Sequence, residues 1–117
     1  MKITIEGELP ALNEIISASK AHYQAYNQLK KQATERVAWK AKGLPKMEKI
    51  FLDITYYCKN KRKDPDNIAA AKKFILDGLV KSGVISNDGW KEVAGWEESW
   101  EKDKENPRIE VEIKEVE

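Results

Sequence analysis

Residues 61–67, KRKDPDN, place three consecutive cations directly before two carboxylates that are one residue apart. Carboxylates without nearby histidine or cysteine favour hard divalent cations such as Mg²⁺ or Mn²⁺. Lys61, Arg62 and Lys63 could hold phosphates, while Asp64 and Asp66 could hold a metal ion that activates water. The alternative is that the two acids only stabilise the start of a helix through its dipole and that the cations are solvated. At this point both interpretations are open.

The spacing of the charges that follow favours a site. Asp64 fits a helix N-cap and Pro65 the first helical position, so we expect one helix from there to Gly83. On a continuous helix, positions 66, 73 and 77 share one stripe, which aligns an acid, a lysine and a second acid. Asp88 lies in the turn signal SNDG, and it could reach the acidic start of the helix if the turn folds back. The expected buried face of the helix comprises Ile68, Ala71, Ile75 and Leu79.

These residues carry a family resemblance. Residues 61–93, KRKDPDNIAAAKKFILDGLVKSGVISNDGWKEV, resemble the RusA family of Holliday junction resolvases, especially its phage and prophage variants. The family pattern is a basic run, D-x-D-N, a helical lysine, D-x-L, and a glycine-containing turn ending in an acidic pair. The matching positions are Asp64, Asp66 and Asn67, then Lys73, then Asp77 and Leu79, and finally Asp88.

The sequence departs from that pattern in two places. Asn87 replaces the first acid of the pair, which leaves three matched carboxylates rather than four. The spacing from Asp66 to Asp77 is also three residues longer than in the best-known members. The extra residues precede the helical lysine, so the choice between Lys72 and Lys73 stays open. Three residues are close to one helical turn, and the stripe is roughly kept.

The resemblance implies a homodimer that binds four-way DNA junctions and nicks two strands symmetrically, in DNA recombination and repair. It implies that Mg²⁺, with Mn²⁺ as a possible substitute, is held by Asp64, Asp66 and Asp88. Lys73 would stabilise the transition state, and Asp77 would lie behind the metal ligands. The remaining implied DNA contacts are Lys61, Arg62, Lys63, Asn67 and Lys72, with bases of the first long helix.

Periodicity predicts the elements that must position these residues. Alternation predicts strands at 2–6, 50–57 and 108–114, and helical spacing predicts a long helix from about residue 19 to Lys42. LPALNEII, residues 9–16, is expected to be an irregular entry to that helix. The expected fold is therefore an α+β (mixed α/β) single domain over 1–117, with a small mixed sheet and two main helices.

Composition narrows the function classes. The net charge of +1 hides a split, because residues 92–117 carry ten acids and four bases, whereas the preceding residues carry 17 bases and ten acids. A polyanionic partner is therefore compatible with the total. We expect no membrane association and a cytoplasmic product, since the chain shows no long apolar run and its N-terminal residues do not resemble a signal peptide. The family resemblance implies that the protein is bacterial or phage-encoded.

Other residues with possible chemistry give weaker signals. Cys58 is the only cysteine and His22 the only histidine, so a disulfide or a histidine-based zinc site is not expected. Trp90, Trp96 and Trp100 are interleaved with acids, which favours core or dimer packing over base stacking. The competing functions are a non-catalytic phage DNA-binding protein and a nuclease of the same fold that acts on other branched DNA.

Overall fold

The computed structural model describes all residues from 1 to 117. Its four strands are β1 (Lys2–Glu6), β2 (Ile50–Cys58), β3 (Val93–Lys102) and β4 (Arg108–Glu115). They form one mixed sheet in the order β1-β4-β2-β3, in which β4 is antiparallel to both of its neighbours and β3 is parallel to β2. The helices are α1 (Leu12–Ala21), α2 (Tyr23–Ala41), α3 (Pro65–Ala69) and α4 (Lys72–Lys81). The predicted α+β class and mixed sheet are confirmed.

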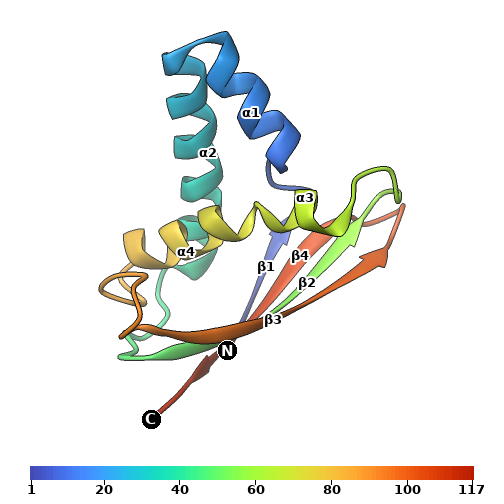
Figure 1. Cartoon of the computed structure of the whole chain (residues 1–117). Helices are drawn as coiled ribbons and strands as arrows, with labels where there is room; N and C mark the ends of the chain where they lie inside the picture. The colour runs from blue at the N-terminus through green and yellow to red at the C-terminus, as the bar shows by residue number, and fades with distance from the viewer.

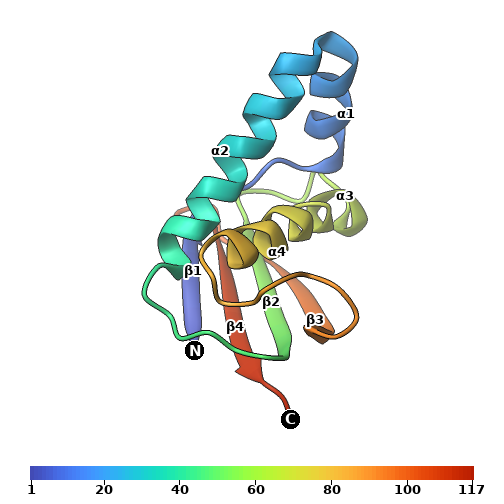
Figure 2. The ribbon, with the colours of Figure 1, turned by 90° about the vertical axis from the view of Figure 1, so that its left-hand side faces the viewer.

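The helices cover one face of the sheet (Figure 1). The predicted strand alternation is confirmed, because every second side chain of β2 is buried against the helices. In α2 only the C-terminal half contributes to the core, while its N-terminal half and α1 stand away from the sheet (Figures 1 and 2). The fully buried side chains at the centre are Ile5, Ile50, Leu52, Ile54, Tyr56, Ile75, Leu79, Ile85, Ile113, Val37, Val84 and Val111.

The single helix predicted over 64–83 is wrong, because it is divided into α3 and α4. At the join, the backbone N–H groups of Ala71, Lys73 and Phe74 donate to carbonyls three residues earlier rather than four. This tighter winding changes the helical phase. Asp66 therefore does not share a continuous helical stripe with Lys73 and Asp77, although the latter two remain one turn apart.

Two further elements were not expected. The segment predicted to be irregular, residues 9–16, contains the start of α1, a helix without any buried residue. β3 was also missed, and it is an edge strand with no fully buried side chain. The expected C-terminal ends of the helices are correct, since Gly43 and Gly83 have φ values of 90° and 86° just after α2 and α4. The expected start of the long helix at about residue 19 is wrong, because the extended backbone of His22 separates α1 from α2.

Gly78 marks the point of closest approach between α4 and α2. A Cβ added at Gly78 would lie 2.5 Å from both Cβ and Cγ1 of Val37 and 3.0 Å from the backbone nitrogen of Ala38. The middle residue of the D-x-L motif is therefore glycine because the two helix backbones pack closely here. This contact fixes the position of α4 and its Asp77 relative to α2.

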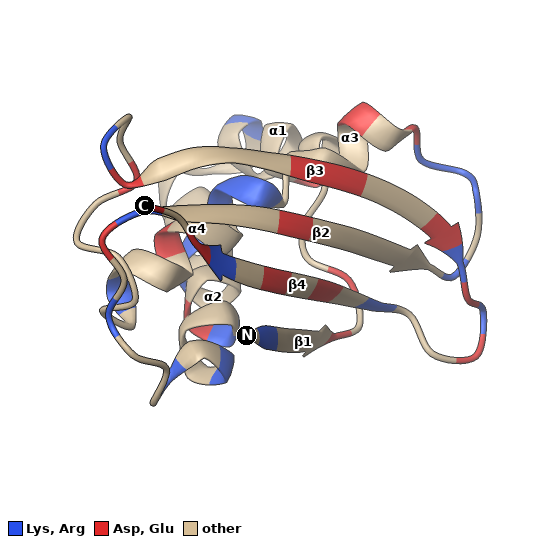
Figure 3. Cartoon of the chain, turned by 90° about the horizontal axis from the view of Figure 1, so that it is seen from below, with Lys and Arg blue, Asp and Glu red and all other residues tan.

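The sheet face that the helices leave open is acidic (Figure 3). Asp53 of β2 is directly opposite Glu97 of β3 and Glu112 of β4. Such a row of like charges disfavours the approach of a polyanion, so a nucleic acid would bind elsewhere on the molecule. No helix is both long enough and apolar enough to cross a membrane.

Candidate functional site

The basic run lies in the loop between β2 and α3. Lys61 and Arg62 are exposed, and neither side chain takes part in an ion pair or a hydrogen bond. The loop is shaped by Asn60, whose Oδ1 accepts the backbone N–H of Arg62 at 3.0 Å. Both cations are thus free of partners within the chain.

Lys63 differs from its two neighbours because its ammonium group is already paired. Its Nζ donates to Oε1 of Glu14 in α1 at 2.7 Å, which raises the pKa of Lys63. Burial alone would raise the pKa of Glu14, but the hydrogen bonds from Lys63 and from the backbone N–H of Ala11 outweigh it, so this pKa lies below its ordinary value. In this structure Lys63 ties the basic loop to α1.

Asp64 and Asp66 stand at the start of α3. The predicted placement of Asp64 at the N-cap and of Pro65 in the first turn is confirmed, although the Asp64 side chain makes no capping hydrogen bond. Asp66 lies in the first turn. Both residues are exposed, and neither carboxylate has a hydrogen-bonding or ion-pair partner. Their oxygens are available to bind another group.

Asn67 contacts the protein itself. Its Oδ1 accepts the backbone N–H of Asn13 in the first turn of α1 at 3.1 Å, across 54 residues of sequence. Ala11 is the N-cap of α1 and has no side-chain oxygen, so Asn67 satisfies a donor that the helix would leave unpaired. We therefore assign Asn67 a supporting role for α1, α3 and the loop between β2 and α3.

Lys73, Asp77 and Asp88 lie together. Lys73 Nζ is 3.0 Å from Oδ1 of Asp77 and 3.4 Å from Oδ2 of Asp88. The hydrogen bond to Asp77, with the charge of Asp88, raises the pKa of Lys73, so its ammonium group is charged at neutral pH. The other oxygen of Asp77, Oδ2, is buried without a hydrogen-bonding partner. Asn87, which stands where the family has an acid, accepts the backbone N–H of Asp88 at 2.9 Å and shapes the turn.

Lys72 points into a separate network on the sheet. Its Nζ lies 2.8 Å from Oε1 of Glu98 in β3 and 4.3 Å from the ring centre of Trp96. The hydroxyl of Tyr56 donates to the other carboxylate oxygen of Glu98 at 2.8 Å, and burial together with this bond raises the pKa of Tyr56. The two neighbouring lysines thus contact different carboxylates, Lys72 that of Glu98 and Lys73 those of Asp77 and Asp88.

Three of the four tryptophans, Trp90, Trp96 and Trp100, lie in different environments. Trp100 stacks on Tyr56 with 5.7 Å between ring centres, so it packs against the core as expected. Trp96 is partly exposed beneath Lys72. Trp90 is 98% exposed, so it does not belong to the core of this chain.

His22 is the N-cap of α2, where its Nδ1 accepts the backbone N–H of Gln24 at 3.1 Å.

The predicted metal ligands do not converge within one chain. No group of three or more histidine, cysteine, aspartate or glutamate side chains is placed so that it could hold a metal ion. The structure instead shows two parts, the unpaired carboxylates Asp64 and Asp66 at α3 and the cluster of Lys73 with Asp77 and Asp88 at α4. The first pair fits a hard cation in donor chemistry, since its oxygens have no competing partner.

Sequence reasoning missed two residues that organise this region. Glu14 anchors the basic loop and Glu98 holds Lys72. Glu98 lies in β3, and its inward position could be inferred only if that strand had been expected. Glu14 lies in the first turn of α1, where an acid before a helical run is a weak signal of a helix start.

Free cations on one loop, unpaired carboxylates at the next helix and an acidic opposite face are features of a protein that acts on a nucleic acid. The family model described as Endodeoxyribonuclease RusA matches residues 7–114 of the chain. The chain therefore belongs to the RusA family of endodeoxyribonucleases, which confirms the resemblance drawn from residues 61–93. A search of curated proteins finds no match.

Family membership sets the class of activity. It makes the protein an endodeoxyribonuclease of the Holliday junction resolvase type, and it implies a branched DNA substrate. Nucleases of this family are typically metal-dependent.

Proposed function

We propose that the chain, working as one nuclease domain over residues 1–117, is a Mg²⁺-dependent endonuclease that resolves four-way DNA junctions by paired symmetric nicks. The observation that carries this proposal is the position of Lys73. It lies in the first turn of α4, the helix that follows α3, and its ammonium group contacts the carboxylates of Asp77 and Asp88. These residues are the ones that match the family motif.

Different side chains of the chain have different roles in cleavage of the phosphodiester. Lys61 and Arg62 bind flanking phosphates, because their charges are exposed and unpaired. The ammonium group of Lys73 stabilises the negative charge that develops on the scissile phosphate. Lys63, Asn67 and Lys72 act indirectly, since their polar atoms already position the loop and the two helices.

The metal ligands in this proposal are Asp64, Asp66 and Asp88. A bound Mg²⁺ would supply activated water and neutralise charge on the phosphate, with Mn²⁺ as a possible substitute. Because Asp88 contacts Lys73 within the chain, it can join the pair at α3 in two ways. Either the junction draws the turn toward α3, or a second copy of the chain supplies its own Asp88.

A homodimer suits the substrate on symmetry grounds. A four-way junction has approximate two-fold symmetry, and a two-fold dimer presents two equivalent active sites to it. Mixing Asp66→Asn and Asp88→Asn protomers distinguishes the two origins of Asp88. If the second copy supplies Asp88, mixed dimers regain one intact site and nick one strand. If Asp88 comes from the same chain, both sites stay damaged and the mixture is inactive.

Cleavage of a synthetic four-way junction in Mg²⁺ tests the proposal. Wild-type protein should produce paired nicks, and Asp66→Asn should abolish cutting while binding is kept or tightened. Asp53→Asn is the matched control. The alternation of β2 places Asp53 on the sheet face away from the helices, so this variant should cut normally. If Asp66→Asn cuts as fast as wild type, the assigned site is wrong. Duplex and flap substrates, tested alongside, show whether the four-way junction is the preferred branched DNA.

A further inference from the structure

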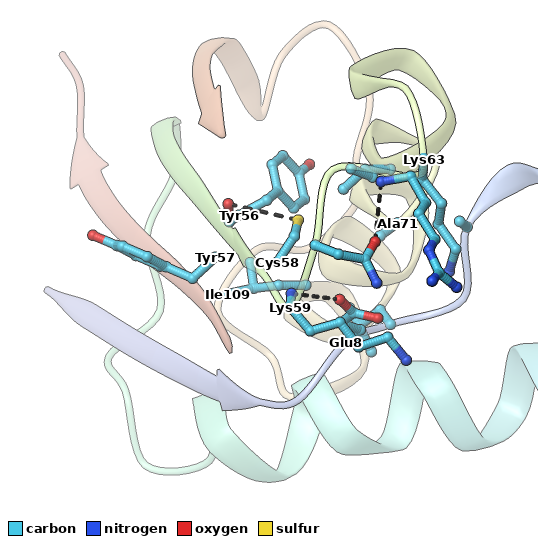
Figure 4. A pocket seen from close by; sticks show the side chains of 13 residues that line it. Glu8, Tyr56, Tyr57, Cys58, Lys59, Lys63, Ala71 and Ile109 are labelled. Carbon is cyan, nitrogen blue, oxygen red and sulfur yellow. Dashed lines mark hydrogen bonds between the residues drawn. The ribbon is translucent and has the colours of Figure 1, made fainter. Parts of the chain in front are cut away.

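A cavity of about 230 Å³ lies where the basic loop, the β1–α1 connection and the join between α3 and α4 meet over the end of β2 (Figure 4). None of the family-motif carboxylates lines it. Its position matters because the loop that covers it is the loop with the unpaired cations. The lining residues that carry the argument are Glu8, Cys58, Lys59, Asn60, Arg62 and Ala71.

The cavity has an apolar floor and a charged mouth. Leu9, Tyr56 and Ile109 are buried lining residues and form the floor. Lys59 and Arg62 also line it but are exposed, so they stand at the mouth. A purely apolar ligand would gain nothing from the cations, and a free anion would gain nothing from the floor. The lining fits a ligand with both an apolar part and adjacent negative charge.

Polar groups near the mouth remain free to bind such a ligand. Asn60 uses its Oδ1 for the backbone N–H of Arg62, so its amide NH₂ is available as a donor. Glu8 accepts the backbone N–H of Lys59 with Oε2 at 3.3 Å, which leaves Oε1 as an acceptor. One donor and one acceptor are what the edge of a nucleobase requires.

The cavity is held open by contacts between distant segments. The Lys63–Glu14 ion pair and the Asn67–Asn13 hydrogen bond join the loop and α3 to α1. The Glu8–Lys59 hydrogen bond joins the β1–α1 connection to the end of β2. Its walls are thus fixed before any ligand arrives.

We propose that this cavity receives one unpaired nucleobase from the branch point of the DNA, while Lys61 and Arg62 hold the phosphates beside it. The inference rests on the proposed function, because it needs a branched DNA on the basic loop. The volume is below the range of about 300–1,000 Å³ that holds drug-sized ligands, so it suits a single ring system rather than a whole nucleotide. Bases at a branch are easier to unstack than bases within a duplex, which makes the branch the natural source.

Fluorescence of 2-aminopurine tests base insertion directly. The probe is placed in turn at each position next to the branch of a four-way junction, and Ca²⁺ replaces Mg²⁺ to prevent cutting. We expect fluorescence to rise several-fold at one position or a symmetric pair of positions when wild-type protein binds. A duplex carrying the same probe should show no rise. Junction binding without a rise at any position overturns the proposal.

Cys58 offers a way to plug the cavity without a core substitution. It is the only cysteine in the chain, and its side chain lines the cavity. Benzyl methanethiosulfonate would add a benzylthio group to the folded protein at mildly alkaline pH, since burial raises the pKa of this thiol. The plug should remove the fluorescence rise while junction affinity stays within about threefold, because phosphate contacts dominate binding.

Cys58→Ser is the matched control, because the reagent cannot modify it and treatment should change nothing relative to the untreated variant. Ala71→Leu is an independent plug, checked for folding by its unfolding transition. If the plugged protein gives the same fluorescence rise as the open one, the base does not enter this cavity. Failure of the proposed function is a different result, in which wild-type protein neither prefers nor cuts the junction.

Discussion

The Nζ atom of Lys73 lies 3.4 Å from Oδ2 of Asp88, so the turn after α4 folds back against the first turn of that helix. Lys72, one residue earlier, points instead to Glu98 on the sheet at 2.8 Å. Two adjacent lysines therefore contact different carboxylates on different elements. The same substitution at each position should separate catalysis from stability.

Lys73→Met should abolish most cleavage and leave the fold intact. Removing a group that stabilises transition-state charge costs about 10²–10³-fold in kcat. The side chain of Lys73 is 60% exposed but that of Asp77 only 20%, so the free energy of unfolding should fall by about 1 kcal/mol, less than for Lys72→Met. Single-turnover cleavage of a junction and urea denaturation measure the two effects. Cleavage at the wild-type rate would contradict the assignment.

Lys72→Met should show the opposite pattern. The side chains of Lys72 and Glu98 are only 18% and 13% exposed, so losing the lysine leaves a poorly solvated carboxylate with Tyr56 as its remaining partner. We expect the free energy of unfolding to fall by about 1–3 kcal/mol. Measured at a temperature where the variant is fully folded, its cleavage rate should remain closer to wild type than that of Lys73→Met. A stable but inactive Lys72→Met would transfer the catalytic role to Lys72.

Gly78→Ala tests the packing of α4 against α2. Helix propensity alone predicts that alanine stabilises α4 by about 0.8–1.0 kcal/mol. The new methyl group would meet Val37 at 2.5 Å, which overpacks the contact and costs about 1–3 kcal/mol or more. We therefore expect net destabilisation in thermal or urea unfolding. Since the two effects have opposite signs, an increase in stability would show that the helices separate easily.

The strands whose alternate residues are buried could be predicted from the sequence. The alternating residues of β2 and β4 face the core as predicted because they lie at the centre of the sheet. β3 is an edge strand with exposed acids, so burial imposes no clear alternation on it. α1 buries no residue, and its apolar side chains Leu12 and Ile16 stay exposed, so burial in the core of this chain does not impose a helix there.

The candidate site could likewise be predicted only where local sequence preferences determine the structure. The N-cap position of Asp64 follows from local preferences and was predicted, whereas the break between α3 and α4 falls in a run of alanines that carries no stop signal. Sequence spacing also could not decide between Lys72 and Lys73. Lys72 donates a hydrogen bond to Glu98, and Glu98 lies in β3, the strand that the sequence did not predict.

Glu14→Gln should make the free energy of unfolding depend less on pH in the acidic range. The pKa of Glu14 is lowered from its ordinary 4.5 in the folded protein, so its stabilising effect is present above 4.5 and is lost as the pH falls through the lower folded value. We expect the free energy of unfolding of the wild type to exceed that of Glu14→Gln by up to about 1 kcal/mol at neutral pH, because the Lys63–Glu14 pair is half-exposed. Near pH 3 the two free energies should be equal.

The difference between the two proteins is the quantity to measure, by urea unfolding at several pH values. Asp103 and Glu110 also have lowered pKa values, so the wild-type curve alone would mix three groups. A difference that persists unchanged at low pH would show that charge on Glu14 is not the cause.

Arg62→Ala should weaken binding to all junction sequences alike and reduce its dependence on salt. The guanidinium group is exposed and unpaired, so it can neutralise a phosphate and release a counterion. Each such contact contributes about 0.9 to the slope of log K against log salt concentration on duplex DNA. Lys63→Ala is the informative comparison, because its ammonium group is already bound to Glu14 and its loss should alter the slope less. Titrations at four or more salt concentrations without divalent metal give both slopes. A loss of affinity confined to one sequence would assign Arg62 to base recognition instead of phosphate binding.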